Sequence, residues 1–532
     1  MDTLQDLFRR LEQLNTIGTA LSHERDISRL LENILVAAKT ITEADGGTLY
    51  RVSEDQKFLH FEIVRTDSLN IAFGGASGKP ISAKFADLPL FRDDGSPNNS
   101  MVAAYSALHA ETVNIADAYA ADGFDFSGTR RFDQNTGYRS QSFLTVPMKN
   151  HENEVIGVLQ LINARDGNNG VRPFSDADRR LAESLASQAA VALTNRLLIT
   201  QLEELFEAFI NMINTAIDEK SPYTGGHCQR VPVLTMLLAE AVNDSTEGPL
   251  AGFRMSEKDR YELKIAGLLH DCGKVTTPVH VVDKATKLET IFDRIHLIDT
   301  RFEVVRRDLE IEALRAIADG EPRPKAEARL AARLHQLDDD RQFLRHCNVG
   351  GEAMRPEDQE RVRQIASAWR WVGSDGRPAD FLSSDEVDNL TIRAGTLTAA
   401  EREVINHHIV ATIKMLEALP WPKHLKNVPE YAGGHHERMD GKGYPKGLTR
   451  EQMSVQARMM GIADIFEALT ASDRPYKKPM KLSLALDILR KFAEGGHIDP
   501  DLFEVFVKQK VYLRYAEQFL DAGQIDEVPV SG

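Results

Sequence analysis

The stretch that most constrains the fold is LKIAGLLHDCGK at residues 263–274, where an apolar helical run ends in His270 and Asp271. Neighbouring residues on a helix point about 100° apart, so these two side chains can reach one centre only at a helix end. Gly273 opens the chain at that point. Imidazoles and carboxylates together suit Mn, Fe, Zn or similar divalent ions, and one carboxylate can bridge two of them. Asp271 is therefore the expected bridging residue.

Other histidines with glycines or carboxylates beside them concentrate in the C-terminal half. The stretch GGHHERMDGKGYP at residues 433–445 places two adjacent histidines after two glycines, which are expected to give the chain the freedom that adjacent ligands need. Asp464 interrupts an apolar helical run, and burying it without a cation is costly. The residues in such settings are His227, His270, Asp271, His407, His408, His435, His436 and Asp464. A lone histidine usually has a structural role, but together these residues indicate a metal site.

The composition argues against several classes of protein. The chain has 532 residues, enough for three or so domains, and its 64 Lys and Arg against 80 Asp and Glu give a formal charge of −16. This charge argues against non-specific binding to nucleic acid or to anionic membranes. Three distant cysteines without a CxxC pair indicate neither a disulfide framework nor a cysteine zinc site. No apolar run reaches membrane-span length and the start lacks signal-peptide features, so we expect a cytoplasmic protein.

The spacing of apolar residues separates an α+β part from a helical part. Helical spacing over residues 5–42 precedes several strand-like runs. These runs are residues 46–52, 58–64, 142–148 and 155–162, the last two joined by a polar turn. We expect an α+β sensor domain at residues 1–197 and a helical domain at residues 220–520. A strongly charged helical insertion with solvated faces is expected at residues 290–396.

One long helix is expected to connect the two parts. Residues 176–219 contain no Gly or Pro and would span roughly 66 Å as a single helix. Its apolar residues alternate in steps of four and three from Leu181 to Ala216, with the polar Gln188 and Asn195 in the same register. This heptad is typical of a parallel coiled coil, so we expect a homodimer. The alternative is an amphipathic helix packed on its own domain.

The C-terminal motifs resemble those of the HD-GYP family, a branch of the HD phosphohydrolases whose members hydrolyse the bacterial second messenger cyclic di-GMP. The resemblance covers about residues 221–289 and 397–515, through YTxGHxxRV, LLHDCGK, HHERMDGKGYPKGL and ADIFEALTASDRPYK. It implies two divalent metal ions per chain, Fe, Mn or similar. The implied ligands of the first are His227, His270, Asp271 and Asp464, and those of the second are His408, His435, His436 and the bridging Asp271.

The same resemblance implies further site residues. Asp271 and Lys274 would be catalytic, and Lys274, Arg474 and Lys477 would face the phosphates of the substrate. Family members with three metals carry a Glu four residues before the first ligating histidine, where this chain has Tyr223, so two metals are expected.

The N-terminal part is similar to GAF domains of the cyclic-nucleotide phosphodiesterase type. The similarity rests on VNIADAY at residues 113–119, TGYRS at 136–140 and GVLQLIN at 157–163. No cysteine precedes Cys228, which excludes a thioether-bound bilin. An NKFDE-like element is only partly present, so binding of a cyclic nucleotide is one option and a purely structural, dimerising domain is another.

The expected protein is thus multidomain, with a GAF domain, a connecting helix and an all-α HD-GYP domain that carries an insertion. The implied activity is metal-dependent hydrolysis of cyclic di-GMP to pGpG and/or GMP, regulated by the GAF domain and a small-molecule GAF ligand of unknown identity. Two other interpretations stay open. The chain could be a catalytically weak cyclic di-GMP receptor, or an HD hydrolase acting on another cyclic dinucleotide.

Overall fold

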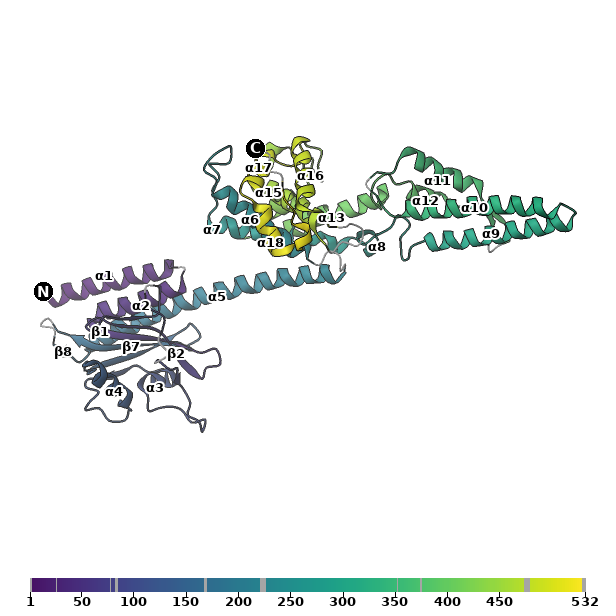
Figure 1. The fold of residues 1–532 in the computed structure, drawn as a ribbon. Helices are drawn as coiled ribbons and strands as arrows, with labels where there is room; N and C mark the ends of the chain where they lie inside the picture. The colour runs from purple at the N-terminus through teal and green to yellow at the C-terminus, as the bar shows by residue number, and fades with distance from the viewer. Residues whose placement is uncertain are drawn as a thin grey trace. The chain divides into compact units, whose positions relative to one another are not determined.

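The computed structural model describes residues 2–24, 26–76, 78–81, 85–166, 170–220, 226–351, 353–373, 376–472 and 479–528. The chain divides into two compact units, Met1–Phe206 and Glu207–Gly532. The first is an α+β unit and the second is made almost entirely of helices (Figure 1). This confirms the expected fold class.

The first unit is built on an antiparallel sheet with the strand order β3-β2-β1-β7-β6-β5. Its main strands are β1 (Ala44–Val52), β2 (Phe58–Thr66), β3 (Ile71–Phe73), β5 (Val113–Ile115), β6 (Phe143–Lys149) and β7 (Val155–Arg165). Two further short strands are β4 (Leu88–Pro89), beside β2, and β8 (Val171–Arg172), beside β7. The four expected strand-like runs correspond to β1, β2, β6 and β7. Sequence analysis missed the strands of two or three residues, which are too short to show alternation.

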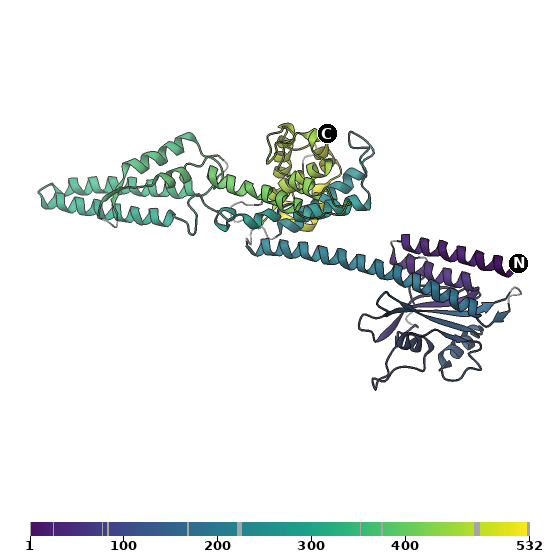
Figure 2. The ribbon, with the colours of Figure 1, turned by 180° about the vertical axis from the view of Figure 1, so that it is seen from behind.

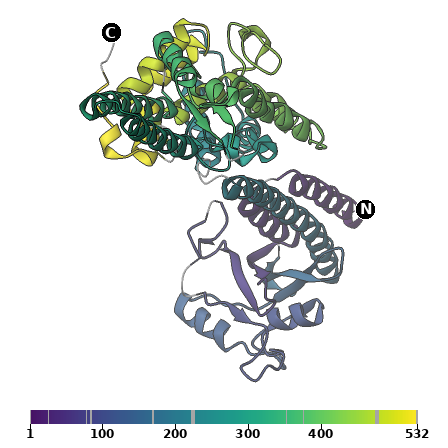
Figure 3. The same cartoon turned by 90° about the vertical axis from the view of Figure 1, so that its right-hand side faces the viewer.

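Helices cover both faces of this sheet. One face carries α1 (Asp2–His23), α2 (Ile27–Thr42) and α5 (Asp176–Lys220), and the other carries α3 (Val102–His109) and α4 (Ser127–Thr136) (Figure 1, Figure 3). Successive side chains of a strand point to opposite faces. Leu49 and Leu159 therefore join the core beneath α2 and α5, while Tyr50 and Val158 join the core that includes α3.

The first half of α5 belongs to the core of the first unit. Leu181, Leu185, Ala189 and Leu193 are buried there, together with apolar residues of α1, α2 and the sheet. The predicted dimer seam is therefore wrong for this half of the helix, because Leu181 and Leu185 are covered by their own chain. Here the alternative holds, that of an amphipathic helix packed on its own domain.

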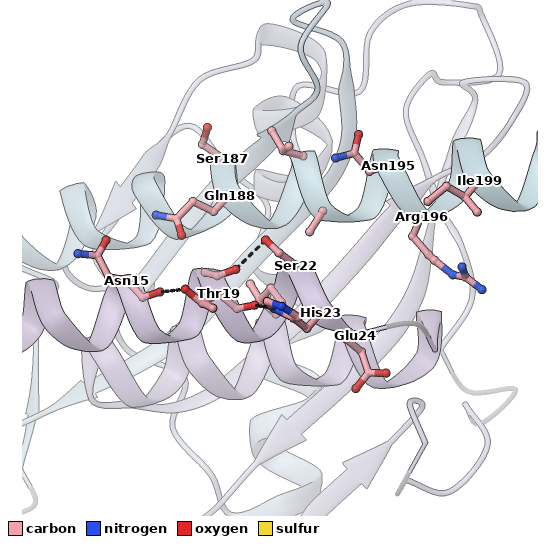
Figure 4. A pocket seen from close by; sticks show the side chains of 14 residues that line it. Asn15, Thr19, Ser22, His23, Glu24, Ser187, Gln188, Asn195, Arg196 and Ile199 are labelled. Carbon is pink, nitrogen blue, oxygen red and sulfur yellow. Dashed lines mark hydrogen bonds between the residues drawn. The ribbon is translucent and has the colours of Figure 1, made fainter. Parts of the chain in front are cut away.

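A polar groove of about 760 Å³ lies between α1 and α5 (Figure 4). Gln188 and Asn195, the polar residues of the predicted seam, are among the residues that line it. A Cβ atom on Gly18 would lie only 2.0 Å from Gln188 Oε1, so α1 and α5 approach closely at this point. Gln188 therefore contacts a helix of its own chain.

The end of α5 packs within the second unit. Ile210, Asn214 and Ile217 are buried at helical spacing. The Asn214 side chain donates to the Leu268 carbonyl oxygen in α7 (Glu257–Leu269), at 2.9 Å. Lys220 Nζ donates to the Val275 carbonyl oxygen in the short 3-10 helix η1 (Cys272–Thr276). The last turns of α5 are thus bonded on both sides of the corner between α7 and η1.

The second unit is organised around α6 (His227–Asn243), which packs against α7 and three later helices. Those helices are α15 (Val455–Thr470), α17 (Pro500–Lys508) and α18 (Val511–Phe519). A second group forms where α13 (Ala399–Glu417) packs against η1 and α14 (Val428–Gly433). Outside the insertion, this unit also contains α8 (Val279–Val282), η2 (Arg450–Gln452), α16 (Leu482–Glu494) and η3 (Ala522–Gln524).

The charged insertion has a hydrophobic core of its own. The long helices α9 (Ile295–Ala318) and α10 (Arg323–Asn348) lie side by side, as Figure 2 also shows. They are followed by α11 (Pro356–Ala368), the hairpin β9 (Arg370–Val372) and β10 (Pro378–Asp380), and α12 (Ser384–Leu390). Phe302 packs on Phe381 with ring centroids 4.6 Å apart, among other buried apolar residues. The insertion is mainly helical with solvated charged faces, as expected, but it also contains a short hairpin and a hydrophobic core that the sequence analysis did not predict.

No described helix of this protein combines the length and the apolar character that a bilayer crossing requires.

Candidate metal centre

The centre is built around the corner at which α7 ends and η1 begins. His270 is the C-terminal cap of α7, and Asp271 is the residue before η1, with φ −109°. Both side chains are buried. The change of direction lets two consecutive residues face one cavity, as the sequence indicates. The corner thus places an imidazole and a carboxylate side by side.

Five other side chains converge on this corner from different elements. His227 begins α6, His408 lies on α13, His435 and His436 directly follow α14, and Asp464 lies on α15. Six of these seven side chains, all except Asp464, fall into two groups that share Asp271. One group is His227, His270 and Asp271, and the other is Asp271, His408, His435 and His436. The structure therefore brings together all seven residues that the resemblance implies as metal ligands.

The two oxygens of Asp271 face the two groups separately. Oδ2 lies 3.1 Å from His227 Nε2 and 3.2 Å from His270 Nε2. Oδ1 lies 3.3 Å from His408 Nε2. Asp464 completes the first group, since its Oδ1 lies 3.1 Å from His227 Nε2. A carboxylate placed in this way can bridge two cations.

The orientation of three imidazoles follows from a repeated backbone contact. The Nδ1 atoms of His270, His408 and His435 each lie within hydrogen-bond distance of the carbonyl oxygen three residues earlier. A carbonyl oxygen can only accept, so each Nδ1 must carry the proton. The lone pair then belongs to Nε2, which is the tautomer that a metal requires when Nε2 is the ligand.

The buried polar atoms of the cluster fit bound cations. Asp271 Oδ1 and His435 Nε2 are buried and make no hydrogen bond to any described residue. His408 Nε2 and His436 Nε2 lie 3.2 Å apart. Each neutral imidazole carries one acceptor lone pair, and this contact can satisfy only one of the two. Unsatisfied buried acceptors are costly, and a divalent cation would satisfy them together. The residues present therefore fit the metal ions that the resemblance implies.

The electrostatics agree with this donor set. Burial, aided by the neighbouring imidazoles, holds the pKa of His435 well below its usual value. Burial also lowers the pKa of His436 to about 4. Burial alone would raise the pKa of Asp271, but the Lys274 ammonium and His270 hold it well below the usual range. At neutral pH His435 and His436 are therefore neutral and Asp271 is ionised, as metal ligation requires. Burial would lower the pKa of His227, but the Glu467, Asp271 and Asp464 carboxylates raise it to about 10, so a metal ion bound there would displace a proton.

A carboxylate that the sequence analysis did not single out orients His227. Glu467 Oε2 lies 2.5 Å from His227 Nδ1, and Oε1 accepts from Arg230 Nε at 2.8 Å. Glu467 is fully buried. It lies three residues after Asp464 on the same face of α15, and that spacing within an apolar run is the signal that could have identified it. Such a partner fixes the tautomer of a ligating histidine and raises its basicity.

Gly273 fixes the position of η1 against α13. Its N–H donates to Thr412 Oγ1 at 2.9 Å. A Cβ at residue 273 would lie 2.0 Å from the His408 carbonyl oxygen and 2.5 Å from the Thr412 nitrogen. This close approach is the reason for the glycine, and it is what brings Asp271 to His408.

Replacing Gly273 with Ala is therefore expected to force η1 away from α13. We expect the free energy of unfolding of the second unit to fall by about 1–3 kcal/mol, as is typical of overpacking, and the metal content to fall with it. Thermal unfolding and elemental analysis of the full chain measure both effects. Gly252→Ala is the matched control, because a Cβ there meets nothing within 4 Å. Equal behaviour of the two variants would contradict the role of Gly273.

The loop after α14 shapes the other side of the cluster. Glu437 is buried and accepts from the backbone N–H groups of Lys446 and Leu448. The Tyr444 ring stacks on His436, with centroids 4.8 Å apart and planes at 22°. Burial and the nearby carboxylates raise the pKa of the Tyr444 hydroxyl, so it stays protonated. The loop thus supports His436 with an aromatic face.

The two glycines before the histidine pair have a different role from the expected one. Gly434 has an ordinary helical conformation, with φ −94°. A Cβ on Gly433 would lie 2.7 Å from Ile413 Cγ1, and one on Gly434 would lie 2.9 Å from Ala457 Cβ. The glycines therefore allow close packing of α14 against α13 and α15.

The residues expected to face the substrate are only partly described. Lys274 lies at the edge of the cluster, with Nζ 2.5 Å from Asp271 Oδ2. Arg474, Lys477 and Tyr223 lie outside the described residues.

The GAF-like motifs of the first unit have structural contacts. Asn163 Oδ1 accepts from the Gln141 and Ser142 N–H groups, and Asp178 accepts from Ser175 N and pairs with Arg172. These side chains hold turns of their own chain.

Comparison with known proteins agrees with both parts of the resemblance. Residues 26–193 match the GAF domain family, and residues 224–362 and 384–502 match two HD domain families. The chain therefore carries a GAF domain followed by an HD region.

Three curated relatives resemble parts of the chain. A cyclic di-GMP phosphodiesterase of Pseudomonas aeruginosa is 40% identical over 23% of this chain. Two proteins of Vibrio cholerae serotype O1 are a 3'3'-cGAMP-specific phosphodiesterase, 43% identical over 15% of the chain, and a probable cyclic di-GMP phosphodiesterase, 34% identical over 25%. The matched segments span 28%, 19% and 31% of these relatives, less than a third of their lengths.

Proposed function

We propose that this chain is a metal-dependent phosphodiesterase that hydrolyses cyclic di-GMP to pGpG and/or GMP. The observation that carries the proposal is the position of Asp271, whose two oxygens face separate groups of inward-pointing imidazole nitrogens. The names of the relatives support the substrate class.

The proposed ligands divide into two sets around the shared carboxylate. His227, His270, Asp271 and Asp464 would hold one metal ion, and Asp271, His408, His435 and His436 would hold the second. When bound, the metals would supply Lewis acidity, which acidifies a water molecule and offsets the negative charge that builds up on a phosphodiester. Glu467 holds the His227 tautomer, and the backbone carbonyls hold those of His270, His408 and His435.

Lys274 would provide a positive charge for the phosphate. Its ammonium pairs with Asp271 Oδ2 and its side chain is 17% exposed, so a non-bridging phosphate oxygen could approach it. A charge-assisted hydrogen bond of this kind strengthens as the transition state gains charge.

Lys274→Ala is expected to keep its metals and to lose about tenfold in kcat/KM, or ~1.4 kcal/mol. The variant removes a cation that faces the substrate and leaves every proposed ligand in place. Steady-state kinetics and elemental analysis measure the two quantities. Lys258→Ala, which removes an exposed lysine of α7, is the control. Loss of metal from Lys274→Ala would contradict the proposed role.

Two other candidate functions are separated from this one by a single experiment. A receptor would bind cyclic di-GMP without turnover, and a hydrolase of another substrate would favour a different cyclic dinucleotide. The second alternative is favoured by the relatives named as 3'3'-cGAMP-specific phosphodiesterases. Metal analysis combined with turnover of cyclic di-GMP, 3'3'-cGAMP and cyclic di-AMP decides among the three. Metal-loaded protein that binds cyclic di-GMP but hydrolyses none of them would overturn the proposal.

We also propose that the chain forms a homodimer along the second half of α5. Leu198, Leu202, Leu205, Phe209 and Met212 are 51–66% exposed. They follow one another in steps of four and three, which forms a heptad seam along one face of the helix. This seam differs from the one predicted from the sequence. It contains Leu205 and Met212 in place of their neighbours Phe206 and Ile213. A second copy of α5 would cover these side chains.

Replacing both Leu202 and Phe209 with Glu is expected to convert the dimer to monomer at micromolar concentration, because four like charges would meet in the seam. Light scattering after size exclusion measures the mass. The control is Gln201→Glu with Ala208→Glu, which adds charge at the same spacing on an exposed adjacent position. A monomeric wild-type protein, or a double variant that stays dimeric, would contradict this dimer.

Regulation by the GAF domain would act through the same helix. A ligand of the first unit can change activity only if it binds two conformations of the chain unequally. The bonds from Asn214 to Leu268 and from Lys220 to Val275 would carry such a difference to the metal centre.

A further inference from the structure

A cavity of about 640 Å³ lies where the insertion meets α13. Two loops form one side of it, one at residues 350–351 within the insertion and one at residues 395–397 where the insertion ends. The loops are joined by a hydrogen bond from Gly395 N to Gly351 O, at 3.0 Å. The cavity is large enough for a nucleobase with its ribose, since ligand pockets commonly measure about 300–1,000 Å³.

The loops are held firmly against the catalytic part of the unit. The Thr396 hydroxyl donates to the Lys284 carbonyl oxygen at 2.8 Å. The fully buried Lys284 ammonium bonds both oxygens of Glu401 on α13, at 2.8 Å, and Asn389 on α12. The insertion therefore forms a fixed wall of the cavity.

The cavity directly adjoins the proposed metal centre. Ile405 lines it, and the carbonyl oxygen of the same residue accepts from His408 Nδ1. Tyr444 also lines it, and its ring stacks on His436. Three residues of helix advance about 4.5 Å, so the cavity begins roughly one turn away from His408.

The lining combines apolar walls with one polar edge. Val281, Leu397, Ile405 and the Tyr444 ring are apolar surfaces suited to the faces of a flat heterocycle. The polar edge is formed by Arg402 and Asn406, one turn apart on α13. Both side chains are exposed, and the Asn406 amide makes no hydrogen bond to any described residue. Arg402 Nη2 donates to the Ala394 carbonyl oxygen, which orients the guanidinium at this edge.

We infer that this cavity binds one guanine base of a cyclic dinucleotide, that Arg402 determines the choice of base and that Asn406 adds a hydrogen bond to the bound base. The inference rests on the proposed function and adds a specificity site to which the insertion contributes. A guanidinium only donates, and guanine presents two adjacent acceptors, O6 and N7. Adenine presents a donor, its N6 amino group, in place of O6. The cavity therefore favours guanine over adenine at this position.

The test uses Arg402→Ala and Asn406→Ala in the full metal-loaded chain. The substrates are cyclic di-GMP, cyclic di-AMP and bis(p-nitrophenyl) phosphate, a diester without a base. We expect KM for cyclic di-GMP to rise roughly tenfold in Arg402→Ala, because a good guanidinium–guanine contact gives a discrimination of about 1–3 kcal/mol. The preference for cyclic di-GMP over cyclic di-AMP should fall by a similar factor, while hydrolysis of the baseless diester stays unchanged. Arg323→Ala removes an exposed arginine of the same insertion and is the matched control.

Each outcome decides one question. If wild-type protein hydrolyses the baseless diester but no cyclic dinucleotide, the proposed function fails. If wild-type protein hydrolyses cyclic di-GMP and both variants keep its KM and base preference, the inference is overturned. If Arg402→Ala also loses hydrolysis of the baseless diester, the fold of that variant is disturbed. The test of the inference then depends on Asn406→Ala. The Asn406 side chain can be removed without breaking a bond to any described residue, so an unchanged KM for cyclic di-GMP in Asn406→Ala then overturns the inference.

Discussion

Asp271→Asn is expected to remove most bound metal and to lower the hydrolysis of cyclic di-GMP by more than about a thousandfold. Asp271 is the one residue that both ligand groups share. An amide keeps the size of the side chain but replaces one ligating oxygen by an NH₂ group and removes the negative charge. Losing several kcal/mol of charge stabilisation corresponds to a thousandfold or more in rate.

Elemental analysis, turnover and circular dichroism of the full chain test this prediction together. Helix content should stay nearly unchanged, because Asp271 bonds side chains of the cluster and no helix depends on it for a cap. Asp340→Asn is the matched control. Asp340 is also buried, but it pairs with Arg361 and Trp369 in the insertion. An Asp271→Asn variant that keeps both metals and full turnover would show that Asp271 does not bridge them.

Glu467→Gln is expected to weaken metal binding by about 10–100-fold while every proposed ligand stays in place. The amide oxygen of Gln can still accept from His227 Nδ1, but it carries no charge and no longer balances the Arg230 guanidinium. His227 would become a poorer ligand, because the carboxylate no longer raises its basicity. Competition with a chelator during Mn²⁺ titration measures the affinity without reference to activity.

Glu262→Gln provides the comparison for this variant. Glu262 is equally buried in the same unit and accepts hydrogen bonds from the Asn427 backbone and side chain. It contacts no residue of the cluster in the described structure, so its loss of charge should leave the metal affinity unchanged. Equal affinities in the two variants would mean that Glu467 only stabilises the fold.

Several of the proposed ligand positions could be predicted because their motifs lie next to a recognisable helix end. His270 and Asp271 lie at the end of an apolar helix, and the glycines near His435 are visible in the sequence. Glu467 was harder to predict, since its only signal is a three-residue spacing from Asp464. The contact between Gly273 and Thr412 joins residues 139 positions apart in the sequence, and no local pattern reports such a contact.

For the long helix α5 and the insertion, the sequence predicted the helices but not the surfaces against which they pack. The continuity of α5 follows from the absence of Gly and Pro, but its partner changes along its length. Leu185 faces the core of the first unit, whereas Leu205 is exposed, although both are apolar residues of one helix. In the insertion, charged residues dominate the pattern, so the core around Phe302 and Phe381 could not be recognised. Periodicity identifies an apolar face but not the surface that covers it.

If the proposed regulation acts through the end of α5, it must be reciprocal. Asn214 and Lys220 bond the corner that bears Asp271, so under this proposal a rearrangement of the helix and the occupancy of the cluster would depend on one another. Any ligand of the first unit that changes the affinity for metal by some factor must itself bind with an affinity that metal changes by the same factor. Such couplings typically reach about 5–150-fold. Ligand screens on chelator-treated protein would therefore measure a different receptor from screens on the metal-loaded form.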